Sequence, residues 1–215
     1  MAKVQVIKKS RKEYKCSKCG KVIPIGSKYY KGEINFGPTI IRCADCGLKS
    51  YEVTTSDWVM NVGQLLDTWS SEYTICEDGV NDIISAIEEI RDEQQDRLDQ
   101  MPEQLKESSS AGELLSERID ACENAISDLE SIDYEDLKNS SLSTFLGNHE
   151  DDDEYGTIRK ITDSRYESED DIDYDELIEE LREADRDDLA DELESEFTES
   201  LNEVISEALC NNLEV

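Results

Sequence analysis

The chain has 215 residues, of which 37% are hydrophobic and 35% charged, and its formal net charge is −32. The hydrophobic share lies below the roughly 45–50% of ordinary globular domains, which disfavours a compact sheet-based enzyme and favours long amphipathic helices. No run approaches the roughly 18 apolar residues of a membrane span, and the N-terminus lacks a signal peptide's apolar region, so we expect a cytoplasmic protein without membrane contact.

The charge is segregated along the chain. Residues 1–50 hold twelve basic and three acidic residues, whereas residues 51–215 hold ten basic and fifty-one acidic residues. Adaptation to high salt would also produce an acidic protein, but it would spread the acid over every surface. The segregation therefore favours a small basic N-terminal part joined to a polyanionic body, an arrangement suited to binding partners rather than to turnover of a substrate.

Residues 1–53 predict a small β-rich unit. Short apolar runs at 4–7, 23–25, 29–30, 34–36 and 39–42 alternate with tight turns, one of them at Gly37-Pro38. Such short strands around paired cysteines indicate a zinc-ribbon-like head.

Two Cys-x-x-Cys pairs give the strongest functional signal in the sequence. They are 23 residues apart, and each is followed by a glycine that frees the backbone of its turn. Four thiolates complete the closed tetrahedron that Zn²⁺ prefers, which leaves no position for a catalytic water. Seven cysteines without a secretory signal also favour metal and free thiols over disulfides. We therefore expect a structural zinc ion bound by Cys16, Cys19, Cys43 and Cys46.

Residues 54–138 predict an acidic helical hairpin region. Thr55 or Ser56 can cap a first helix, whose apolar residues recur at three- and four-residue spacing over 58–69. Apolar stripes at 80–101 and 114–132, joined by a loop at 102–112, predict two antiparallel helices, with Pro102 ending the first of the two. Cys122 lies in the apolar stripe and is expected in the core, whereas Cys76 and Cys210 have no evident partner.

Residues 139–171 predict an acidic, partly disordered linker, with one short ordered piece at 157–161. Residues 172–215 predict acidic C-terminal helices, with apolar stripes at 172–181 and 189–209. The run 151–162 partly matches a calcium-binding loop, but Thr162 stands where a bidentate Glu is needed.

No catalytic pattern is present in the sequence. The single histidine, His149, falls in the expected linker without an evident partner, and there is no phosphate-binding glycine loop or nucleophile elbow. We therefore expect a protein that is not an enzyme.

The run 16–30 contains a CGKxIxxGxxYY core, and it is followed by Arg42 with 43–46 and by the segments 54–56, 88–91, 100–103 and 118–122. In these residues the sequence resembles a group of tailed-bacteriophage proteins, in which a four-cysteine finger with such a core runs into an acidic helical region. The likeness covers about residues 10–133, and 150–215 has no counterpart in that group. The resemblance implies a phage origin and a zinc finger, but no activity, because the function of the group is uncharacterised.

The acidic body raises the hypothesis of DNA mimicry. Residues 183–209 carry eleven acidic residues and one basic residue, a net charge of −10. This segment would span about 40 Å as a helix, over which duplex DNA presents roughly 24 charges. One helix therefore falls short by more than half, and only two acidic helices side by side would approach the charge density of DNA.

The leading hypothesis is a phage protein that binds and modulates or inhibits a host protein, as an anti-defence factor would. Its acidic body would occupy the basic surface of a nuclease or another nucleic-acid-binding enzyme in the host cytoplasm. A second hypothesis is a nucleic-acid-binding finger regulated by the acidic tail, with bases stacking on Tyr14, Tyr29, Tyr30 or Phe36. A third is a virion or assembly component that forms homo-oligomers, and the simplest alternative is an acidic surface that only confers solubility.

Overall fold

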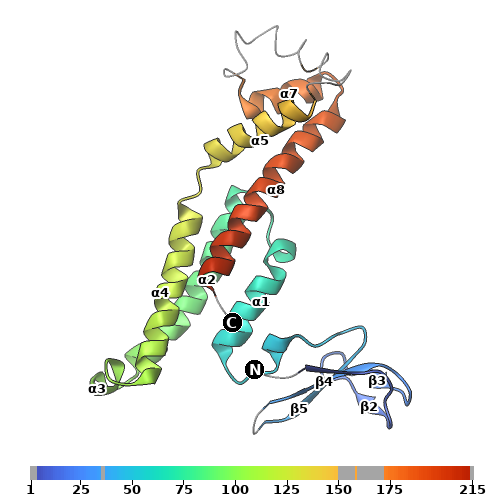
Figure 1. The fold of residues 1–215 in the computed structure, drawn as a ribbon, viewed down its shortest axis with the longest axis vertical. Coiled ribbons are helices and arrows are strands. Elements are labelled where there is room, and N and C mark those ends of the chain that lie inside the picture. The colour runs from blue at the N-terminus through green and yellow to red at the C-terminus, as the bar shows by residue number, and fades with distance from the viewer. Residues whose placement is uncertain (1–3, 35–36, 150–157, 159–171, 214–215) are drawn as a thin grey trace. The chain divides into compact units, whose positions relative to one another are not determined.

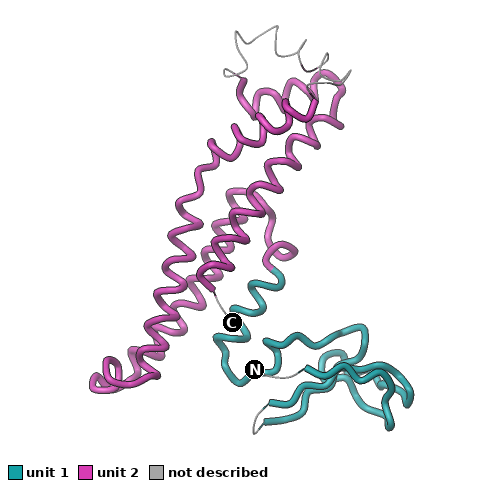
Figure 2. Tube along the Cα trace, viewed as in Figure 1, with its two compact units in different colours: residues 1–68, 214–215 teal, residues 69–213 magenta. Residues whose placement is uncertain are grey.

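The computed structural model describes residues 4–34, 37–149, 158 and 172–213, and the chain divides into two compact units. The first, here called the head, comprises residues 1–68 with 214–215, and the second, the body, comprises residues 69–213 (Figure 2). The boundary falls inside helix α1 (Asp57–Glu72), beyond the predicted boundary at residue 53.

The head contains two small antiparallel sheets (Figure 1). In the larger sheet, β4 (Tyr29–Glu33) lies between β1 (Val4–Ile7) and β5 (Thr39–Cys43). The smaller sheet pairs β2 (Tyr14–Lys15) with β3 (Val22–Ile23). The predicted β-rich head is therefore confirmed.

The register of the larger sheet separates a buried face from a partly open one. Ile7, Tyr29 and Cys43 lie opposite one another, and Tyr29 and Cys43 join Cys16 and Ile23 in a small core. Because side chains alternate along a strand, the residues beside them point to the other face. That row consists of Val6, Tyr30 and Arg42.

The segment after β5 closes the head. It contains the short 3-10 helix η1 (Ser50–Glu52) and the first turns of α1. A Cβ atom added at Gly32 of β4 would lie 2.6 Å from Val53, and one added at Gly63 of α1 would lie 2.4 Å from Tyr51. These close approaches require glycine, and they explain why the head extends past residue 53.

Ser56 precedes α1 as the sequence predicts. Its hydroxyl accepts a hydrogen bond from the Val59 N–H at 3.4 Å, which satisfies one of the unpaired donors at the helix start. Within the head, the Lys49 Nζ lies 2.7 Å from the Asp67 Oδ1, and the Tyr51 hydroxyl donates to the same carboxylate. These contacts fix α1, at Asp67, to the segment that follows β5.

The predicted helical hairpin is present in the body. Helix α2 (Glu77–Asp99) packs against α4 (Ser110–Glu130), and the short α3 (Glu103–Lys106) lies in their connection. Cys122 is fully buried in this contact, as expected. One polar pair interrupts the apolar stripe, since the Arg118 Nη1 donates to the Oε1 of the buried Gln94 at 3.4 Å.

A second cluster in the body is formed by α5 (Tyr134–Asn148), α7 (Tyr174–Glu183) and α8 (Asp187–Asn212). Residues 139–148, predicted as linker, are therefore helical. Leu142 and Phe145 bury their side chains at helical spacing, a stripe that the surrounding Ser and Asn residues obscure in the sequence. The rest of the predicted linker lies outside the described residues, except His149 and Ile158, and Ile158 is buried in this cluster.

His149 follows α5 and is not isolated. Its ring packs edge-on against Phe145 with centroids 4.8 Å apart, and its Nε2 lies 3.2 Å from the Glu192 Oε1. The expectation from the sequence that His149 has no partner is therefore wrong. Its contacts indicate a role in packing.

The solvent faces of the body helices are acidic. Helix α2 has nine acidic and two basic residues, and α4 has six acidic residues and one basic residue. Helix α8 has nine acidic residues and no basic residue. All six acidic residues of α4 and eight of the nine on α2 are exposed. None of the helices in the described ranges is long and apolar enough to cross a membrane.

Candidate metal centre

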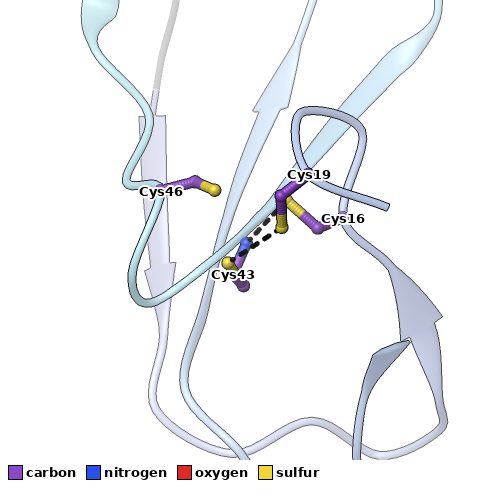
Figure 3. Close-up of side chains that lie close together, drawn as sticks. All are labelled: Cys16, Cys19, Cys43 and Cys46. Carbon is purple, nitrogen blue, oxygen red and sulfur yellow. Dashed lines mark hydrogen bonds between the residues drawn. The ribbon is translucent and has the colours of Figure 1, made fainter. Parts of the chain in front are cut away.

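The four predicted ligands converge in the head. Figure 3 shows Cys16 and Cys19 coming from one turn, with Cys43 and Cys46 coming from the end of β5 and the turn that follows. All four sulfur atoms lie within 4.8 Å of one another, and the Cys19 and Cys43 Sγ atoms are 3.8 Å apart. Zinc–sulfur bonds of about 2.3 Å in a tetrahedron place sulfurs about 3.8 Å apart, so the cluster fits a tetrahedral metal ion.

The two turns are built alike. The Gly20 N–H donates to the Cys16 carbonyl at 3.0 Å, and the Gly47 N–H donates to the Cys43 carbonyl at 3.1 Å. Both glycines have positive φ values, 72° and 62°, a conformation that side chains with a Cβ atom disfavour. The glycine after each cysteine pair therefore lets the chain reverse directly behind the ligands.

Ser17 holds the first cysteine turn against the strand that leads to the second. Its N–H donates to the Ile41 carbonyl at 2.8 Å, and its hydroxyl donates to the same carbonyl at 2.6 Å. The hydroxyl also accepts from the Ile41 N–H at 3.1 Å. Ser17 was not predicted from the sequence, where a serine between two cysteines gives no sign that it joins a strand.

Two further contacts link the cysteine turns. The Cys43 N–H donates to the Cys16 Sγ at 3.3 Å, and the Lys21 Nζ lies 3.4 Å from the Asp45 Oδ2. The hydrogen bond and the charge of Asp45 raise the pKa of the Lys21 ammonium group, and the charges of Cys19 and Cys43 raise it further. A positive charge is thus held beside the thiolates, although this ion pair is exposed and contributes little by itself.

The thiols of the cluster have very different proton affinities. Burial opposes ionisation of Cys16, but backbone N–H groups of Cys19, Cys43 and Lys18 donate to its sulfur, and its pKa falls to about 6. The Cys46 thiol donates hydrogen bonds to the Cys43 and Cys19 sulfurs, which favours its neutral form and raises its pKa to about 12. One thiolate therefore forms easily, whereas ionisation of all four requires a cation among them.

The four cysteines differ in burial. Cys16 and Cys43 are buried, Cys46 is half-buried and Cys19 is exposed. The cluster thus lies at the edge of the small core, with a complete set of four protein ligands. A tetrahedral set of four thiolates suits zinc and also iron, so the four cysteines could hold a metal ion, and their geometry does not distinguish between these two metals.

The other predicted site residues are not brought together in this way. Tyr29 is 6% exposed and packs against Tyr14 with ring centroids 5.0 Å apart, so it cannot stack on a base as the nucleic-acid hypothesis supposed. Tyr30 is half-buried and remains accessible, while Phe36 and the calcium-like run 151–162, apart from Ile158, lie outside the described residues. Cys76 is half-buried and Cys210 exposed, and neither belongs to the cluster of four.

Comparisons with known proteins give no family assignment. No protein-family model, curated protein or solved structure matches the chain.

Proposed function

We propose that the metal is zinc and that its role is to fold the head. The support is the donor set, because four thiolates close the coordination shell and leave no open position for water or substrate. The head core outside the ligands is also small, so a bound ion would supply much of its folding free energy. Elemental analysis of the purified protein should find one zinc per chain, whereas iron would give visible absorption and contradict this assignment.

We further propose that the protein is not an enzyme and that its body binds a basic surface on another protein. The observation that carries this proposal is the pairing of α2 with α4. Together the two helices hold fifteen acidic and three basic residues, a net charge of −12. Over the roughly 34 Å length of α2, duplex DNA carries about 20 charges, so the hairpin reaches about 60% of the density of DNA.

A single helix supports the proposal less well. Helix α8 carries a net charge of −9 over about 39 Å, where DNA would carry about 23 charges. The hairpin therefore meets the condition that the sequence sets, namely two acidic helices side by side. The surface it suits is a DNA-binding groove lined by Lys and Arg, such as that of a nuclease, and the resemblance to phage proteins would make the partner a host protein.

The test is an affinity purification of the tagged full-length protein from host cells, with nuclease treatment before elution. A basic protein partner that survives nuclease and dissociates with rising salt supports the proposal. Recovery of nucleic acid alone, or of no partner, would contradict it. A purified protein that forms a defined oligomer without any partner would instead support the assembly hypothesis.

Two matched variants test whether partner binding depends on the surface of the hairpin or only on the net charge of the protein. The hairpin variant replaces Asp82, Glu89, Glu117 and Glu123 by their amides, and the tail variant does the same to Asp191, Glu199, Glu203 and Glu207. All eight side chains are exposed, and each variant changes the net charge by the same amount. We expect the hairpin variant to lose partner binding at least tenfold and the tail variant to retain it. Equal losses would show that only the overall charge matters.

A further inference from the structure

The partly open face of the larger sheet in the head carries a feature that the proposed function does not use. It lies at the end of this face away from Gly32, where Val53 and Leu48 cover the sheet. Tyr30 stands in the middle of this face, with Val6 directly across on β1 and Arg42 directly across on β5. Tyr30 is half-buried, whereas Val6 is 52% exposed although it is apolar. An accessible aromatic ring beside an exposed aliphatic side chain forms a flat surface on a rigid strand.

Three lysines lie at one end of this surface. The Lys28 Nζ lies 5.2 Å from the centroid of the Tyr30 ring, over its face. Lys8 and Lys9 directly follow β1 and are placed next to Lys28 by the hydrogen bonds on both sides of them. Ile7 pairs with Tyr29 on one side, and on the other the Ser10 N–H donates to the Ser27 carbonyl at 2.9 Å.

The charges of these lysines are available to a ligand. Lys21, Lys31 and Lys49 of the head pair with carboxylates, so their charges are already compensated. No carboxylate in the described part of the chain pairs with Lys8, Lys9 or Lys28, and all three are exposed. Arg42, by contrast, lies 3.3 Å from the Glu52 Oε1, so its charge is already compensated.

We propose that Val6, Tyr30, Lys8, Lys9 and Lys28 form a binding surface for single-stranded nucleic acid. A base would stack on the Tyr30 ring and on Val6 in place of the Lys28 ammonium group. That group would then join those of Lys8 and Lys9 on the phosphates that flank the base. Aromatic stacking combined with a cationic track is the general way in which proteins hold single strands. Duplex DNA cannot present an unstacked base to Tyr30, so a single strand is the ligand that uses the whole surface.

This role is independent of the acidic body. The surface lies entirely in the head, and its loss would leave the hairpin unchanged. Of the aromatic residues in the nucleic-acid hypothesis that the structure describes, Tyr29 is buried and Tyr14 packs against it, which leaves Tyr30 as the ring for stacking.

The test measures binding of a fluorescein-labelled oligothymidylate to the full-length, metal-loaded protein by fluorescence anisotropy at several salt concentrations. Three phosphate contacts predict a slope of log K against log salt of about −2 for a single strand. Tyr30→Val keeps a strand-forming residue and should weaken binding about fivefold or more, the loss of one stacked base. Lys28→Gln should weaken binding and bring the slope to about −1.4.

Lys15→Gln is the matched control for charge. Lys15 is an exposed lysine of β2, in the other sheet, and its replacement should leave binding within twofold. Metal content and circular dichroism of each variant report whether the head has folded. Absence of binding, equal effects of Lys15→Gln and Lys28→Gln, or equal affinity for duplex and single strand would each overturn the proposal. Binding of polyglutamate as tight as that of the oligonucleotide would show a surface for acidic protein instead.

Discussion

Each cysteine turn of the metal centre depends on one backbone conformation. Gly20 and Gly47 both have positive φ values and follow directly after a ligand pair, where the chain must reverse behind the metal. A Cβ atom at Gly47 would meet nothing within 4 Å, so crowding does not restrict this position. The need for glycine there comes from the backbone alone, which makes the position a clean probe of the turn.

Gly47→Ala should therefore destabilise the metal-bound head by about 1–2 kcal/mol, the cost of a left-handed conformation for a residue with a Cβ atom. In a chelator competition this corresponds to a metal affinity roughly five- to thirtyfold lower. Gly47→Asn should lose less, because Asn tolerates this conformation better than Ala. Equal affinities of the wild-type, Ala and Asn proteins would show that the turn is not strained.

At the scale of single elements, glycines in two helices have opposite roles. Gly63 of α1 faces Tyr51 so closely that a Cβ atom would lie 2.4 Å from the Tyr51 Cβ, whereas Gly147 of α5 has open space around it. Helix propensity alone favours alanine over glycine at both positions by roughly 1 kcal/mol. Packing decides which of the two can realise that gain.

We expect Gly147→Ala to raise the free energy of unfolding by up to about 1 kcal/mol, since alanine restricts the unfolded chain and meets no neighbour. Gly63→Ala should lower it by about 1–3 kcal/mol, because Tyr51 must move. Urea unfolding followed by circular dichroism measures both. A stabilising effect of Gly63→Ala would mean that the segment around Tyr51 is not packed on α1.

At the scale of the whole molecule, the two units have different sources of stability. The head has a small core next to four thiols, whereas the body has an apolar hairpin and a larger cluster that contains no metal ligands. Because metal binding and folding are coupled in small thiolate domains, the head should depend on its ion. The body should stay folded without a metal ion.

Removal of the metal by a strong chelator should therefore unfold the head and leave the helices of the body folded. Circular dichroism at 222 nm should change little, while fluorescence of Trp58, which is buried in the head, should shift to longer wavelength. Thermal scans should show two transitions with metal and one without it. Simultaneous loss of the helical signal would show that the body depends on the head.

The sequence by itself determined the features that are written in local spacing. Two Cys-x-x-Cys pairs with their glycines, the hydrophobic stripes of α2, α4 and α8, and the segregation of charge all follow from residue order. Only the tertiary structure decided what depends on contacts between distant residues. One is the hydrogen bonding of Ser17 to β5, and another is the burial of Tyr29 but not of Tyr30. A third is the helix at 139–148, which has too few apolar residues for a recognisable stripe and is stabilised by packing against α7 and α8. The physical reason is that spacing fixes the direction of a side chain along its own element, whereas burial depends on which other elements pack against it.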